Sequence, residues 1–169
     1  ISLEDVKNSA AVNAYIKKAD ESLTAIGFTE HSFAHVTKVA LAAADILRAC
    51  GRGEREAELA AVAGYLHDIG NVVNREGHET SGALMAFSLL SGMGADPEDI
   101  ATVIAAIGNH DEGTAFPVNE VAAALILADK TDVRRSRVRS LDTIYQDIHD
   151  RVNYAVIQSE VQIPEGERE

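Results

Sequence analysis

The feature that most constrains this chain is a series of segments in which apolar residues recur at intervals of three and four. That spacing places them on one face of an α-helix, whereas a half-buried strand would require strict alternation. Capping residues mark the segment ends. Asp96 and Pro97 open one predicted helix as N-cap and first helical residue, and Gly51 closes another. The pattern predicts an all-α protein.

We expect a single-domain helical bundle of about six to seven helices, because 169 residues suffice for one compact core and 46% of them are hydrophobic. An N-terminal helix within residues 1–30 is expected to pack on a core formed by residues 31–135. Residues 136–169 are expected to form a C-terminal helix, a short strand from Val161 to Ile163 and a polar tail. The predicted helices span about residues 2–26, 35–50, 54–68, 78–91, 96–108, 120–131 and 141–155.

Net charge limits the partners of this chain. A formal charge of −12 creates a field that repels phosphate, which makes nucleic acid and anionic membranes poor partners. A small phosphorylated molecule would need a local positive centre, formed by metal ions or by an arginine cluster. The single cysteine, Cys50, excludes an intrachain disulfide, and no apolar run approaches the roughly 20 residues of a membrane-spanning helix. We therefore expect a cytoplasmic protein with no membrane segment.

Histidine and aspartate side chains gather at the ends of the predicted helices. Any one of them alone would more often be a helix cap or a surface group. In a bundle, however, the ends of neighbouring helices can converge on one point, and imidazole with carboxylate is a ligand combination for zinc, manganese and iron. His149 lies between acidic residues and is expected on a solvated helix face. The candidates at helix ends are His35, His67, Asp68, His78, His110 and Asp129.

Three fragments of the sequence resemble the HD superfamily of metal-dependent phosphohydrolases. The run Gly64-Tyr65-Leu66-His67-Asp68-Ile69-Gly70 resembles the HDIG signature, and His35-Val36-Thr37-Lys38-Val39-Ala40 is similar to the first histidine helix of that family. Leu127-Ala128-Asp129 is similar to its closing aspartate segment, so the resemblance covers about residues 31–135. It implies an all-α fold and a divalent metal ion held by His35, His67, Asp68 and Asp129.

The resemblance also implies a second ion. Members with two metals have additional histidines between the HD pair and the last aspartate, and His78 and His110 fall there. The run from His78 to Ala83 is similar to the His-x-x-x-Gly-Ala helix start of those members, in which the aspartate equivalent to Asp68 bridges both ions. Iron, manganese, cobalt, nickel or zinc would suit such ligands, and magnesium is also compatible.

The expected function is hydrolysis of a phosphoester of a small molecule, a nucleotide or another phosphomonoester, by a metal-activated hydroxide, with Asp68 as the catalytic metal ligand. Two alternatives stay open: a phosphodiesterase acting on a cyclic dinucleotide or another diester, and a non-catalytic HD module that senses a ligand or docks a partner protein. Asn71 stands where cyclic-dinucleotide phosphodiesterases of the family usually have lysine, which disfavours that substrate.

Further residues are candidates for contact with substrate. His31 precedes His35 by four residues, so the two share a helix face if the helix extends that far; a role in the N-terminal turn is the alternative. Lys130 and Arg134 belong to the most basic stretch of the chain and are candidates for phosphate binding, with plain solvation as the alternative. Asp111 and Glu112 are candidate acid or base groups. A homodimer formed through the first helix is also left open.

Overall fold

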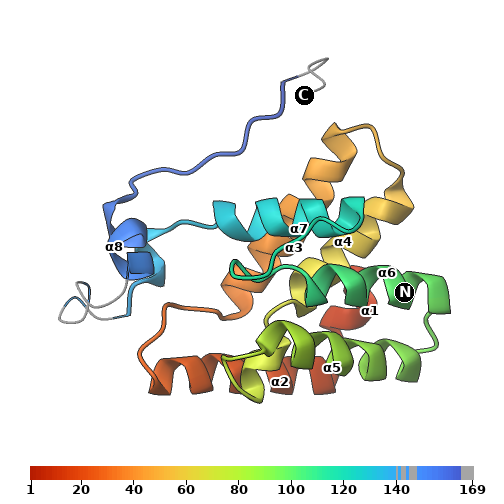
Figure 1. Cartoon of the computed structure of the whole chain (residues 1–169), viewed down its shortest axis with the longest axis horizontal. Coiled ribbons are helices and arrows are strands. Elements are labelled where there is room, and N and C mark those ends of the chain that lie inside the picture. Colours follow the sequence, from red (N-terminus) through yellow and green to blue (C-terminus); the bar gives the residue numbers. More distant parts are fainter. Residues whose placement is uncertain (140, 142–143, 145–147, 165–169) are drawn as a thin grey trace.

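The computed structural model of the chain describes residues 1–139, 141, 144 and 148–164. Within these residues the protein is helical and has no strand, which confirms the predicted all-α class (Figure 1). Its α-helices are α1 (Leu3–Lys7), α2 (Ala10–Ala25), α3 (Phe33–Ala49), α4 (Glu54–Leu66), α5 (His78–Gly92), α6 (Pro97–Gly108), α7 (Glu120–Thr131) and α8 (Ile148–Ala155). Two short 3-10 helices, η1 (Ile69–Val72) and η2 (Arg135–Arg137), follow α4 and α7.

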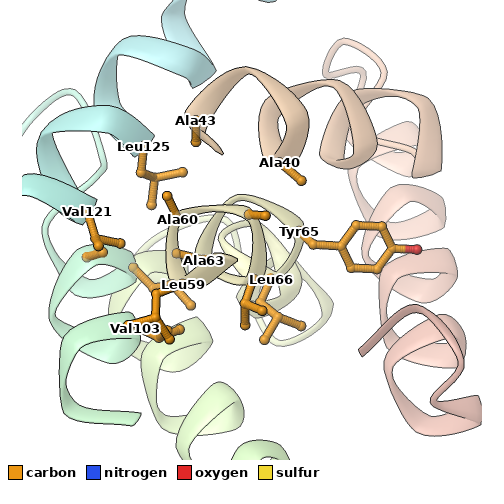
Figure 2. Packing of buried hydrophobic residues seen from close by; sticks show 14 of the residues in the cluster. Ala40, Ala43, Leu59, Ala60, Ala63, Tyr65, Leu66, Val103, Val121 and Leu125 are labelled. Atoms are coloured by element: carbon orange, nitrogen blue, oxygen red, sulfur yellow. The ribbon is translucent and has the colours of Figure 1, made fainter. Parts of the chain in front are cut away.

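Helix α4 forms the centre of the bundle. All of its residues from Leu59 to Leu66 are buried, and a helix that is apolar all round is a core helix. Figure 2 shows Ala40 of α3 and Leu125 of α7 packed around it. Because α4 is enclosed by α3, α6 and α7, the His67-Asp68 pair at its end reaches the middle of the protein.

Helices α3 and α4 pack in very close contact. A Cβ atom at Gly64 of α4 would lie 2.8 Å from Cα and 2.9 Å from the backbone nitrogen of Ala40 in α3, so only glycine fits there. The two helices form a hairpin, with the turn at residues 50–53 between them. The start of α3, which carries His35, therefore lies beside the end of α4, which precedes His67.

The single helix predicted for residues 2–26 is wrong, because the chain breaks between α1 and α2. Ser9 caps α2 by accepting a hydrogen bond from the backbone N–H of Val12 at 3.4 Å. Asn13 of α2 donates to the carbonyl oxygen of Lys7 in α1 at 2.9 Å. Serine competes with the helix for backbone hydrogen bonds, and here the cap prevails. The break lets α1 pack on α4 while α2 packs on η1, next to the HD pair.

The C-terminal region differs from expectation in two ways. The helix predicted from residue 141 is described only from Ile148 to Ala155, since 142–143 and 145–147 lie outside the described residues. The strand predicted at Val161 to Ile163 is wrong: residues 157–164 are exposed and form no helix or strand, and no neighbouring strand completes a ladder in the described part of the chain. None of the described helices has the length and apolar character needed to cross a membrane.

Replacing Gly64 with alanine tests the close packing of α3 against α4. We expect Gly64→Ala to lower the free energy of unfolding by about 1–3 kcal/mol, because the new methyl group meets backbone rather than a movable side chain. Urea denaturation followed by circular dichroism measures the change. Gly92→Ala is the matched control: it also lies in a helix but has nothing within 4 Å of the added Cβ, and it should be neutral or stabilising by up to about 1 kcal/mol. Equal unfolding midpoints for the two variants would contradict the packing argument.

Candidate metal centre

Five histidines form a continuous chain through the centre of the protein. Neighbouring ring centroids lie 5.0 to 5.3 Å apart in the order His31, His35, His67, His110, His78. Asp68 lies beside this chain, and four of the imidazoles, with Asp68, are almost completely buried. Asp129, in the last turn of α7, completes the cluster, with 27% of its side chain exposed. The structure thus brings together all six metal-ligand candidates predicted at helix ends.

Backbone carbonyl groups orient four of these histidines. Nδ1 of His31 lies 2.7 Å from the carbonyl oxygen of Thr29, and Nδ1 of His67 lies 2.8 Å from that of Gly64. Nδ1 of His78 lies 3.0 Å from the carbonyl oxygen of Arg75, and Nδ1 of His110 lies 2.6 Å from that of Ile107. A carbonyl oxygen only accepts hydrogen bonds, so each Nδ1 carries a proton and donates it. Each neutral ring therefore presents the lone pair of Nε2 to the centre of the cluster.

His35 is oriented by a carboxylate instead. Its Nδ1 lies 2.8 Å from Oδ2 of Asp132, a buried residue whose Oδ1 is 2.6 Å from Nε of Arg134 and 3.1 Å from Nζ of Lys38. A carboxylate behind a histidine fixes the tautomer and makes the ring a stronger ligand. Sequence reasoning missed Asp132, although it lies only three residues after the predicted ligand Asp129.

The first group of ligand atoms has the spacing of a coordination shell. Nε2 of His35 is 3.3 Å from Oδ1 of Asp129 and 3.5 Å from Oδ2 of Asp68, and Nε2 of His67 is 3.6 and 3.2 Å from the same two oxygens. Ligands about 2.1 Å from one ion lie roughly 3.0–3.4 Å apart. Among the described residues, buried His35 Nε2 and Asp68 Oδ2 have no hydrogen-bond partner. A divalent cation fits these atoms.

The second group lies on the other side of Asp68. Nε2 of His78 is 3.3 Å from Nε2 of His110 and 3.7 Å from Oδ1 of Asp68. Two lone pairs that face each other cannot form a hydrogen bond, whereas a cation between them would be attracted to both. His67 also approaches this group, since one ligand atom each of His67, Asp68 and His110 lies within 4.8 Å of the others. The second group thus includes one residue more than the three predicted for it.

Asn71 holds Asp68 in place between the two groups. Its Nδ2 donates to Oδ1 of Asp68 at 3.0 Å and to the backbone oxygen of Asp68 at 2.9 Å. The side chain is buried, so the pair of hydrogen bonds is shielded from water. In the sequence, Asn71 was notable only because cyclic-dinucleotide phosphodiesterases of the family usually have lysine at this position. Its contact with Asp68 follows from the turn that η1 makes after α4.

When no cation is bound, additional protons on the histidines balance the negative charges of Asp68 and Asp129. Burial disfavours the charged form of His35, but the carboxylates of Asp129, Asp132 and Asp68 outweigh it and raise the pKa of His35 to about 9. His67 is buried as well, and Asp68 and Asp129 hold its pKa well above the usual range. Burial instead lowers the pKa of His31 and of His110 to about 4. A cation binding to His35 and His67 has to displace their protons.

A cavity of about 570 Å³ opens onto the cluster. Of the predicted substrate and acid-base residues, His31, Lys130, Asp111 and Glu112 line it. His31 lies before α3 rather than on it, in agreement with the alternative of a position in the N-terminal turn, and its Nε2 is 3.9 Å from Oδ2 of Asp68. Lys130 is paired with Glu112 at 3.0 Å.

Arg134, the remaining predicted phosphate-binding residue, contacts carboxylates of the protein instead of the cavity. Its guanidinium group bonds to Asp132 at 2.6 Å and to Glu30 at 3.2 Å, and it does not belong to the cavity lining that the structure describes. Those contacts hold the carboxylate behind His35. His149, predicted to be solvated, is half exposed and is one of the residues that line the cavity.

Comparison with known proteins gives one match. The sequence profile of the HD domain family, described as "HD domain", matches residues 32–152, which is most of the chain. No curated protein and no solved structure matches it.

Removing the charge of Asp132 tests its role behind His35. We expect Asp132→Asn to weaken Mn²⁺ binding by about 10- to 100-fold, because the amide no longer favours the ligand form of the ring as strongly. Competition with a fluorescent chelator measures the affinity. Asp45→Asn, which makes the same change at an exposed ion pair with Arg48, is the control and should leave the affinity unaltered. Equal Mn²⁺ affinities for both variants would show that Asp132 does not act on the metal ligand.

The raised pKa of His35 predicts a pH-dependent metal affinity. Below about pH 9 the His35 ring is protonated, so a cation must release that proton to bind. The apparent Mn²⁺ affinity should therefore rise by at least about tenfold per pH unit from pH 7 toward pH 9. Chelator competition at pH 7, 8 and 9 measures it, and proton release in weakly buffered solution provides an independent count. A flat profile would mean that His35 is not a ligand.

Proposed function

Since the chain belongs to the HD domain family, we propose that it is a phosphohydrolase that uses two divalent metal ions to hydrolyse a small phosphomonoester, such as a nucleotide. The family match supports hydrolase-type activity that depends on a metal. The observation that carries the proposal is the convergence of the Nε2 atoms of the buried histidines on the Asp68 carboxylate, because divalent cations between these atoms would bind the nitrogen lone pairs and the carboxylate oxygens together.

Asp68 is the residue on which both groups of ligands depend. Its Oδ2 faces His35 and His67, while its Oδ1 faces His78. Ions held there would lower the pKa of bound water and polarise a phosphoryl oxygen. The protein's own contribution is orientation: Asn71 fixes the Asp68 carboxylate, and Asp132 fixes His35.

The cavity supports a small organic substrate. About 570 Å³ lies within the range of roughly 300–1,000 Å³ that is usual for small-molecule sites. Its polar lining includes four of the candidate metal ligands, Asp68, His78, His110 and Asp129, while Phe28, Val133, Ile148 and Val152 contribute apolar surface. We assign the phosphate to the polar part and the organic body of the substrate to the apolar part. His31 and Lys130 also line the cavity and are further candidates for contact with the substrate.

Counting bound metal tests whether the centre has two ions. We expect elemental analysis of anaerobically purified protein to give about two ions per chain, falling to about one in His78→Ala and in His110→Ala, because each variant removes one of the two facing lone pairs. His149→Ala serves as the control for metal content, since His149 is half exposed and has no place in the cluster. A wild-type protein that contains no metal and takes none up on titration would exclude the metal centre and favour a non-catalytic binding module.

Replacing Asp68 tests the hydrolase itself. Asp68→Ala should lose metal and turnover together, because both groups of ligands share this carboxylate. Hydrolysis of a panel of phosphomonoesters and phosphodiesters, with Mn²⁺, Fe²⁺ or Zn²⁺ restored, measures the activity. Activity on diesters alone would replace the proposed reaction with a phosphodiesterase, and full activity in Asp68→Ala would contradict the scheme.

A further inference from the structure

Arg75 lies in the loop between η1 and α5 and lines the cavity beside the second group of ligand atoms. Its Nη1 is 3.3 Å from Nε2 of His78 and 3.5 Å from Oδ1 of Asn71. The guanidinium carbon lies 5.5 Å from the ring centroid of Phe28. The backbone carbonyl oxygen of Arg75 accepts the Nδ1 proton of His78. Both the backbone and the side chain of Arg75 therefore contact the cluster.

The guanidinium group of Arg75 has donors to spare. In the described part of the chain the carboxylate that comes closest is Asp111, with Oδ1 at 3.8 Å. By contrast, Arg134 bonds to Asp132 at 2.6 Å, and Arg137 donates to backbone oxygens of Glu30 and Asp132 at 2.9 and 2.8 Å. Those two arginines are bound within the protein. Arg75 has five N–H donors and long contacts only, which is the condition of an arginine ready to bind an anion.

Arg75 points to the place where the proposed second cation would bind. His78 has one lone pair, at Nε2, and this atom faces both the guanidinium group and the second ligand group. Two positive charges this close repel each other unless an anion lies between them. A phosphate whose oxygens face the ligand group on one side and Arg75 on the other satisfies both charges, and planar guanidinium matches two phosphate oxygens at once.

We propose that Arg75 is a substrate-binding residue that grips the terminal phosphate and makes the site selective for phosphomonoesters over phosphodiesters. This inference rests on the proposed function of the centre and names the charge class of its substrate. A phosphomonoester carries close to two negative charges near neutral pH, and a diester carries one. The additional cation therefore stabilises the bound monoester more strongly, while the apolar wall leaves room for the organic body.

Phosphate binding tests the role of Arg75 without requiring turnover. Isothermal titration of the metal-loaded protein with inorganic phosphate should show a Kd at least about tenfold higher for Arg75→Gln than for wild type, and Arg75→Lys should recover part of the loss. Arg52→Gln, at an exposed ion pair with Glu120, is the matched control and should bind phosphate like wild type. Metal content and melting temperature of each variant are measured in parallel.

Substrate selectivity provides the second measurement. For Arg75→Gln we expect kcat/KM to fall about 100-fold for p-nitrophenyl phosphate and less than about threefold for bis(p-nitrophenyl) phosphate. Unchanged phosphate affinity, loss of metal in Arg75→Gln, or equal losses for both esters would overturn the assignment of Arg75. A wild type that binds metal and phosphate, the latter weakened by Arg75→Gln, but hydrolyses no ester would refute the proposed reaction and leave Arg75 as an anion-binding residue.

Discussion

Everything at the centre of this protein depends on the fixed Nδ1 protons of its buried histidines. Because backbone carbonyls accept the Nδ1 protons of His31, His67, His78 and His110, the Nε2 atoms of these rings turn inward toward Asp68. Buried polar atoms without partners cost several kcal/mol, which the apolar core around α4 cannot relieve. Protons on His35 and His67 offset part of this cost, and divalent cations would offset it more completely.

The ends of the helices supply the geometry that this cluster needs. The last carbonyl groups of a helix have no intrahelical partner. The carbonyl oxygen of Gly64 in α4 accepts the Nδ1 proton of His67, the first residue after that helix, and that of Ile107 in α6 accepts the Nδ1 proton of His110, two residues after the end of α6. Gly64 brings the end of α4 against the start of α3, so His35 and His67 lie on the same side of Asp68. The fold thus uses backbone carbonyl groups at helix ends to orient the candidate metal ligands.

The arginines near the cluster fall into two kinds: those bound within the protein, and Arg75, which faces the cavity. In a chain with a net charge of −12, Arg134 and Arg137 are bound to Asp132 and to nearby backbone, where they hold the carboxylate behind His35. Arg75 is left with long contacts at the cavity wall, beside the second group of candidate ligand atoms. An acidic protein can in this way attract a phosphate at one point without becoming a general partner for nucleic acid.

The sequence alone determined the helical class, most helix ends and the six residues that gather at the centre, because apolar periodicity, caps and a family resemblance are all local patterns. It did not determine the break at Ser9, the carboxylate of Asp132 behind His35, or the different positions of Arg134 and Arg75. The carboxylate behind His35 and the pairing of Arg134 depend on side chains that meet over long stretches of chain, since His35 and Asp132 are 97 positions apart and Glu30 and Arg134 are 104 positions apart. The break at Ser9 depends instead on a local competition between a side-chain cap and the continuing helix. Local patterns fix how a segment folds, whereas only packing decides which charge a given arginine will meet.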